Sequence, residues 1–184
     1  MKAFFVIAAL ALAACSQSSD VMRELERAEK ADAKAAEQSA AESARYMEAQ
    51  RARTGVQSTP SGLAYEFVTR STAQNLALTP EGATVLVHYE GKLADGTVFD
   101  SSFERGQRAE FPLNGVIPGF SEALRLMRPG DELIAYIPPD IGYGAQGSPP
   151  AIPPNAALRF RIQLAAYAGP DGTIVASPEL ERRR

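Results

Sequence analysis

The sequence predicts an α+β domain in which a curved antiparallel β-sheet wraps around one short helix, preceded by an N-terminal α-helical spacer. Three observations predict this fold class. Several C-terminal segments alternate apolar and polar residues, one segment among them has helical apolar spacing, and a long N-terminal stretch has neither Gly nor Pro. Because only one helix is available to cover the sheet, closing the sheet over that helix is the economical arrangement.

The first element is a secretory signal, expected at residues 1–14. The opening MKAFFVIAALALAACS has one early lysine and an apolar run that is too short to span a bilayer. Its end, Leu12-Ala13-Ala14-Cys15, resembles the lipobox of bacterial lipoproteins, in which the cysteine is lipidated. Ser16 in place of Asp resembles an outer-membrane sorting signal. The alternative is an ordinary signal peptide with an incidental cysteine.

A helix of some thirty residues is expected next, over residues 20–53, because Ala, Glu, Arg and Lys dominate this stretch. Val21, Leu25 and Ala28 begin a possible seam for a partner helix, but Asp32 interrupts it. A solvated spacer is therefore favoured, and a dimer through this helix remains an alternative.

The turn and breaker residues of Thr54–Gly62 predict a linker. Residues 15–62 thus form the lipidated N-terminus, spacer and linker, and the globular domain is expected at 63–168. Four segments have strand character: Leu63–Arg70, Thr84–Glu90, Asp131–Pro138 and Leu158–Leu164.

The short helix is expected over Phe120–Met127, where Phe120, Leu124 and Met127 lie on one face at i, i+4 and i+7. Residues 169–184 are expected to form a flexible tail.

Composition restricts the chemistry. The 184 residues include 19 basic and 22 acidic side chains, with no basic block except the last three arginines, so no nucleic-acid partner is expected. The single His88 and single Cys15 exclude, within one chain, a metal site of the His/Cys type and a Cys-His or Ser-His catalytic pair. We therefore expect no metal and no cofactor. His88 is given no role, because a lone histidine in a strand-like run is usually a packed or solvated side chain.

Five sequence blocks follow one another in a family order: VHYEGKLADGTVFDSS, FPLNGVIPGFSEAL, GD at Gly130-Asp131, IPPDIGYGAQG and IPPNAALRFRIQL. In this order they resemble the FKBP-type peptidyl-prolyl cis-trans isomerases, over residues 84–167. The preceding GVQSTPSGLAYEFV resembles the lead-in of the bacterial Mip and FkpA type branch.

The resemblance implies a proline pocket and assigns its residues. The polar groups at its mouth, expected to be catalytic, are Asp100 and Tyr143. Arg105 is expected near Asp100, and the backbone N–H of Ile117 is expected to bind a substrate carbonyl. Phe120 would form the floor, and the walls would be Tyr89, Phe99, Val116, Ile117, Ile152 and Phe160.

Three positions depart from the best-studied pattern of the family. Phe120 replaces a tryptophan, Ala109 an aromatic wall residue, and Ser148 a histidine. The pocket is still expected to form, while binding of rapamycin or tacrolimus is expected to be weaker.

The implied activity is rotation about prolyl peptide bonds in unfolded or secreted proteins, which assists folding at the cell envelope. The uncatalysed rotation takes tens to hundreds of seconds. An apolar pocket that removes water from the imide carbonyl favours the twisted state without nucleophile, metal or proton transfer.

Two alternatives remain open. The same pocket could serve a binding module or holdase chaperone, or the spacer helices could pair in a surface-displayed lipoprotein. The expected location is the outer membrane, through a lipid on Cys15, with the domain facing the periplasm.

Overall fold

The computed structural model describes residues 7–73 and 76–178, with side chains from residue 20 onward. The chain divides into two compact units, residues 1–38 and 39–184, which we describe separately. The first α-helix, α1 (Ile7–Arg51), runs through the first unit and ends in the second.

In the first unit α1 is solvated, as the spacer prediction requires. Residues 20–35 are all exposed, including Val21 and Leu25 at 56% and 52%. The signal peptide expected at residues 1–14 and the lipidation of Cys15 lie outside the described side chains. Within the described residues, no helix has the length and apolar character that crossing a membrane requires.

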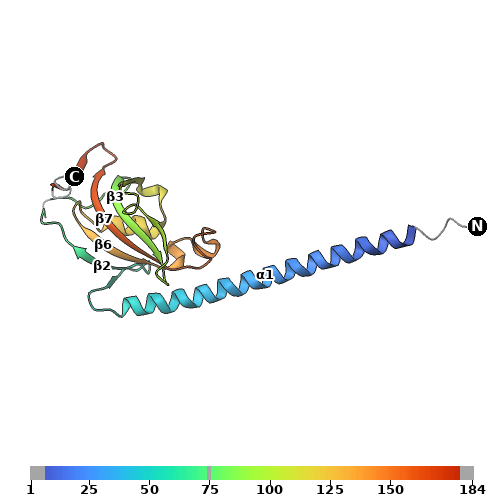
Figure 1. The fold of residues 1–184 in the computed structure, drawn as a ribbon. Coiled ribbons are helices and arrows are strands. Elements are labelled where there is room, and N and C mark those ends of the chain that lie inside the picture. The colour runs from blue at the N-terminus through green and yellow to red at the C-terminus, as the bar shows by residue number, and fades with distance from the viewer. Residues whose placement is uncertain (1–6, 74–75, 179–184) are drawn as a thin grey trace, which may run out of the picture. The chain divides into compact units, whose positions relative to one another are not determined.

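The second unit is built on one antiparallel sheet of eight strands, in the order β1-β2-β6-β7-β3-β4 (Figure 1). β5 also pairs with β3, and β8 pairs with β7. The strands are β1 (Gln57–Ser58), β2 (Ala64–Thr69), β3 (Thr84–Leu93), β4 (Val98–Ser101), β5 (Ala109–Pro112), β6 (Glu132–Ile137), β7 (Leu158–Ala168) and β8 (Ile174–Ala176).

The four predicted strands correspond to β2, β3, β6 and β7. Along β7, Phe160, Ile162 and Leu164 are buried, and Arg159 and Arg161 on the opposite face are partly exposed. This alternation arises because successive side chains of a strand point to opposite faces of the sheet. The buried face forms the main core, together with residues of β3, β6 and the short helix.

The short helix is α2 (Pro118–Arg125), which lies against the sheet (Figure 1). It begins two residues before the predicted start because Pro118 occupies its first turn, where the missing N–H has no cost. Phe120, Leu124 and Met127 are all buried, as their spacing predicts. Three one-turn 3₁₀ helices complete the domain: η1 (Leu113–Gly115), η2 (Pro139–Ile141) and η3 (Gly144–Gln146). The fold class is thereby confirmed.

The expectation of a flexible tail from residue 169 is wrong for the described residues. The chain turns at 170–172 and returns as β8, and Ser177 behind it is fully buried. The turn is a three-residue hairpin loop in which Gly169 N–H donates to Thr173 O at 2.8 Å and Gly172 has φ +81°. Such loops favour glycine at the left-handed position, so the Asp171-Gly172 pair is a hairpin signal that the sequence analysis missed.

The spacer and linker predictions are also wrong in part. Gln57 and Ser58 of the predicted linker form β1, which pairs with β2. The last turns of α1 pack on the domain, where Ser43 and Met47 are 3% and 2% exposed. Met47 forms a second apolar cluster with a residue of β2, one of β6 and the residue before β7: Ala64, Tyr136 and Ala157.

Candidate active site

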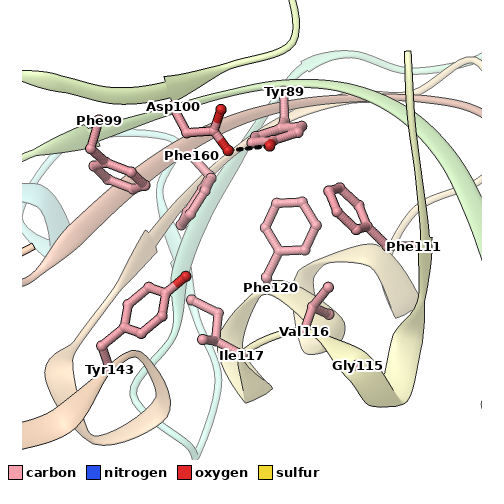
Figure 2. Close-up of a pocket in the computed structure, with 10 residues that line it drawn as sticks. All are labelled: Tyr89, Phe99, Asp100, Phe111, Gly115, Val116, Ile117, Phe120, Tyr143 and Phe160. Carbon is pink, nitrogen blue, oxygen red and sulfur yellow. Dashed lines mark hydrogen bonds between the residues drawn. The ribbon is translucent and has the colours of Figure 1, made fainter. Parts of the chain in front are cut away.

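A cavity of about 280 Å³ opens between α2 and the sheet (Figure 2). Ten residues line it, and they come from β3, β4, β5, β7, the segment from the end of η1 into α2, and the turn between η2 and η3. They are Tyr89, Phe99, Asp100, Phe111, Gly115, Val116, Ile117, Phe120, Tyr143 and Phe160. The wall is thus mainly aromatic, with one carboxylate.

The aromatic rings of the wall support one another edge to face. Phe160 contacts Phe120 at 5.0 Å and Phe99 at 5.5 Å between ring centroids. Phe120 also meets Tyr89 at 6.0 Å and Phe111 at 6.3 Å. Because edge-to-face contacts of this kind are favourable beyond the area they bury, the rings hold one arrangement around the cavity.

Gly91 on β3 makes room for this wall. A Cβ atom at this position would lie 2.5 Å from the ring of Phe99 and 2.9 Å from that of Phe160. Any larger residue would therefore force the two rings to move.

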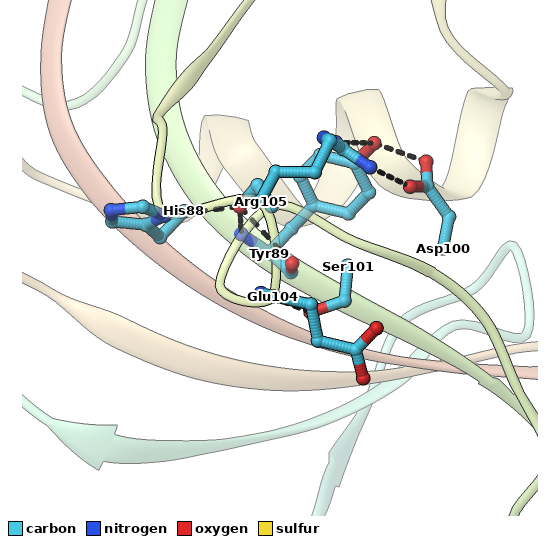
Figure 3. A network of polar contacts seen from close by, with 7 residues as sticks. His88, Tyr89, Asp100, Ser101, Glu104 and Arg105 are labelled. Carbon is cyan, nitrogen blue, oxygen red and sulfur yellow. Dashed lines mark hydrogen bonds and ion pairs between the residues drawn. The ribbon is translucent and has the colours of Figure 1, made fainter.

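Three polar side chains form a network at the mouth (Figure 3). The Tyr89 hydroxyl donates a hydrogen bond to one oxygen of Asp100, and Arg105 donates to the other. Arg105 Nη2 also donates to the Tyr89 hydroxyl oxygen at 3.1 Å. The network therefore holds the Asp100 carboxylate by two donors at the edge of the cavity.

The same network sets the protonation states of Asp100 and Tyr89. Burial by itself would raise the pKa of Asp100, but the hydrogen bonds from Tyr89 and Arg105 and the charge of Arg105 outweigh it and lower that pKa. The pKa of Tyr89 is raised, first by burial and then by its hydrogen bond to Asp100. At neutral pH Asp100 is therefore ionised and Tyr89 is protonated.

The turn after β4 places Arg105 over this network. Ser102, fully buried, pins the turn to β3, because its Oγ accepts from Tyr89 N–H at 2.7 Å and its own N–H donates to Tyr89 O at 2.9 Å. Ser101 Oγ accepts from Glu104 N–H at 3.2 Å and tightens the turn. Arg105 thus reaches back across the turn to the strand end that carries Asp100.

Tyr143 lies across the mouth from Asp100 (Figure 2). It lies between η2 and η3 and is 38% exposed. Ile117 precedes α2 and its carbonyl accepts from the N–H groups of Phe120 and Ser121, which orients the start of the helix beside the cavity.

The structure brings together eight of the predicted site residues as lining, and Arg105 joins them through Asp100 and Tyr89. Ile152 does not line the cavity. It is 4% exposed in the main core, and its backbone pairs with Ser148.

Sequence reasoning missed Phe111, Gly115 and Gly91 as parts of the site. Phe111 had a usable signal, because Ala109 and Phe111 alternate with Glu110 and Pro112, and in the structure these two are the partly buried residues of β5. Gly115 and Gly91 had no such signal in the sequence. A glycine becomes part of a cavity because of the side chains that other segments place beside it.

His88 is a packed side chain, as expected. Its ring stacks on Phe103 at 4.9 Å, Nδ1 lies 3.1 Å from Ser102 Oγ, and burial followed by the charge of Arg108 lowers its pKa. Among the described residues, no group of three or more His, Cys, Asp or Glu side chains is placed to hold a metal ion.

Comparison with known proteins identifies the family to which this fold and this aromatic cavity belong. The family model described as FKBP-type peptidyl-prolyl cis-trans isomerase matches residues 78–165. The model described as the domain amino terminal to FKBP-type peptidyl-prolyl isomerase matches residues 8–67. The chain belongs to the FKBP-type peptidyl-prolyl cis-trans isomerase family.

Individual relatives place it on the Mip and FkpA branch. The FKBP-type 22 kDa peptidyl-prolyl cis-trans isomerase of Escherichia coli is 46% identical over 68% of this chain and 59% of its own length. The isomerase Mip of Coxiella burnetii is 44% identical over 65% of this chain and 50% of its own. The chain therefore spans between half and three-fifths of the length of these relatives.

Solved structures agree with this placement. The crystal structure of FkpA from Escherichia coli is similar with a TM-score of 0.73 and 30% identity, over 96% of this chain and 76% of that one. An isomerase from Pseudomonas syringae has a TM-score of 0.65 and 32% identity, over 71% of this chain and 94% of that one.

Proposed function

We propose that this protein is a peptidyl-prolyl cis-trans isomerase that binds a proline ring in the aromatic cavity and accelerates rotation about the preceding peptide bond. The observation that carries the proposal is the cavity itself, which combines five aromatic rings around its interior, Tyr89, Phe99, Phe111, Phe120 and Phe160, with one ionised carboxylate at its mouth. A pocket of this size and polarity fits a small apolar ring beside a polar peptide backbone.

The rate enhancement follows from what the cavity does to the amide. The barrier to rotation, about 20 kcal/mol, is the loss of amide resonance. Water bound to the imide carbonyl strengthens that resonance, and the aromatic wall excludes water, so the twisted amide is favoured relative to the planar one. A turnover of some hundreds per second would require about 5 to 7 kcal/mol of such differential stabilisation.

The polar residues have separate roles in this proposal. Asp100 interacts electrostatically with the rotating carbonyl or the substrate backbone from a partly desolvated position. Tyr143 is placed to donate a hydrogen bond from the other side of the mouth, and Ile117 N–H binds a substrate carbonyl. Arg105 and Tyr89 keep Asp100 ionised and oriented.

The decisive experiment is a protease-coupled isomerase assay on a short peptide with one Xaa-Pro bond, using the full chain. We expect saturable catalysis that rapamycin inhibits. Rapamycin binding without catalysis would identify a binding module instead, and the absence of both would contradict the proposed pocket. The substrates in the cell would be proline-containing segments of unfolded proteins.

We further propose that the protein acts at the bacterial cell envelope, as a lipoprotein of the outer membrane facing the periplasm. One relative is named outer membrane protein MIP of Legionella longbeachae, at 38% identity. The support within this chain is the apolar N-terminal run that ends in Leu12-Ala13-Ala14-Cys15. Residues 1–14 would be removed and Cys15 would carry the lipid.

The anchor has its own test. Cys15→Ser should abolish labelling by radioactive fatty acid and release the protein from membranes, while isomerase activity in lysates stays at the parent level. Labelling that persists in the variant would contradict lipidation at Cys15.

A further inference from the structure

The hydroxyl of Ser43 is buried in the part of α1 that belongs to the second unit. Ser43 is 3% exposed. Its Oγ donates to the carbonyl of Asn155 at 2.7 Å and accepts from the N–H of Ala157 at 2.7 Å. One helical side chain thus joins two backbone groups that lie more than a hundred residues further along the chain.

The segment that Ser43 holds has an unfavourable backbone conformation. Asn155 has φ +56°, and it is the only non-glycine residue with positive φ among the described residues. Asparagine tolerates the left-handed region better than most residues, but the conformation still requires support from its surroundings. The bond from Ser43 to the Asn155 carbonyl supplies such support.

A second bond connects Asn155 to the mouth of the cavity. Asn155 N–H donates to the carbonyl of Gly144 at 2.9 Å, directly after Tyr143. Gly147 N–H donates to Tyr143 O at 3.1 Å, and Ser148 and Ile152 exchange two bonds at 2.8 and 3.0 Å. The whole loop from Tyr143 to Ala157 is therefore tied together, and its distal end is tied to α1.

Packing keeps the helix in the place where Ser43 can act. Met47, one turn later on the same face, is 2% exposed against Ala64, Tyr136 and Ala157. Further on, Arg51 Nη2 donates to Gly62 O at 2.8 Å. These contacts are spread over several turns, so the helix end is a fixed part of the domain.

We propose that Ser43 is a positioning residue of the isomerase site: through Asn155 it holds the 143–157 loop so that Tyr143 stays at the mouth of the cavity. The inference rests on the proposed function. The end of α1 is then a component of the site, and an isomerase domain that starts after residue 53 lacks it. Substrate binding to such a loosened loop includes the entropy of ordering it.

The test uses the full chain with Ser43→Ala, which removes the hydroxyl without adding volume. We expect faster amide hydrogen exchange at residues 143–157 and no change in β3. We also expect KM for an Xaa-Pro peptide to rise about three- to tenfold, with kcat within about twofold, because ordering the loop affects ground state and transition state alike.

Two control variants separate this role from stability alone. Ser39→Ala makes the same chemical change one turn earlier on α1, at a half-buried position, and should leave KM and loop exchange at parent values. Val175→Ala in β8 removes packing outside the cavity lining and should lower the melting temperature without raising KM.

A Ser43→Ala protein with the KM and loop exchange of the parent would overturn the inference. So would a rise in KM that Val175→Ala reproduces at equal loss of melting temperature. An inactive parent would instead overturn the proposed function. The rate of amide hydrogen exchange at residues 143–157 would still decide whether Ser43 orders the loop.

Discussion

Two networks, each of a tyrosine, a carboxylate and an arginine, lie on opposite faces of the sheet. In one, Tyr89 donates to Asp100 and Arg105 contacts both; in the other, Tyr136 donates to Glu66 at 2.7 Å and Arg53 contacts both. The arginine lies 5.7 Å from the tyrosine ring centroid in the first and 5.8 Å in the second.

Their surroundings differ completely. Tyr89 pairs in register with Ile162, on the face that lines the core and cavity, whereas Tyr136 pairs with Arg159 on the other face. Tyr136 is covered by Tyr46 and Met47 of α1. A tyrosine, a carboxylate and an arginine therefore do not define a site: the same group borders a cavity on one face and fastens a helix end on the other.

The strongest test of this comparison is a matched pair of charge-removing variants, Asp100→Asn and Glu66→Gln. We expect Asp100→Asn to lower kcat/KM about tenfold, equivalent to about 1.4 kcal/mol of transition-state stabilisation. Glu66→Gln should leave kcat/KM within about twofold, because it lies outside the cavity lining. Equal kcat/KM in Asp100→Asn and the parent would contradict an electrostatic role for Asp100.

The loss of folding stability should be larger for Glu66→Gln than for Asp100→Asn. Glu66→Gln weakens the partners of a Tyr136 side chain that is 2% exposed, and should lower the free energy of unfolding by about 1 kcal/mol in urea denaturation. Asp100→Asn should change it by less, since Asp100 is 39% exposed and water can replace lost bonds. A larger loss in Asp100→Asn would mean that the mouth network is chiefly structural.

An aromatic residue beside each of the two networks can be enlarged to tryptophan. Phe120→Trp enlarges the floor of the cavity and should tighten rapamycin binding several-fold, from about 1 kcal/mol of added apolar contact. Most of the gain should lower KM, because proline contacts the floor in both ground and transition states. Titration calorimetry and a thermal melt measure the two effects.

The control is Tyr46→Trp, which enlarges the aromatic residue beside Tyr136 at 6.1 Å and should not change rapamycin affinity. Weaker binding by a Phe120→Trp protein that melts normally would show that Phe120 is not the floor.

The smallest expected effect is that of pH. The pKa of Asp100 is lowered and that of Tyr89 raised, so neither group changes protonation near neutrality. A lowered carboxyl pKa contributes stability above its unfolded value of about 3.9, which is lost as pH falls through the folded pKa. We expect kcat/KM to be constant between about pH 5 and 9. A step within that range would assign the titrating group to another residue.

The sequence predicted the parts of the fold that local patterns specify. The alternation at Leu158–Leu164 and the i, i+4, i+7 spacing of Phe120, Leu124 and Met127 both correspond to the observed elements. The residues of the site came from the resemblance to the family and not from spacing. Eight of them line one cavity, while Ile152 lies in the main core outside its lining.

What could not be predicted depends on contacts between distant segments. Ser43 and Met47 look like ordinary residues of a solvated helix, and only the backbone at Asn155 and the ring of Tyr136 give them partners. In contrast, β8 could have been predicted, because the turn residues Asp171 and Gly172 before it are a hairpin signal in the sequence.

The open cavity depends on the missing side chain of Gly91 at one position of β3. Since a Cβ there would meet Phe99 and Phe160 at less than 3 Å, one methyl group would push two walls of the cavity inward while β3 keeps its hydrogen bonds. Alanine at position 91 would therefore change the shape of the cavity without removing a hydrogen bond of the sheet.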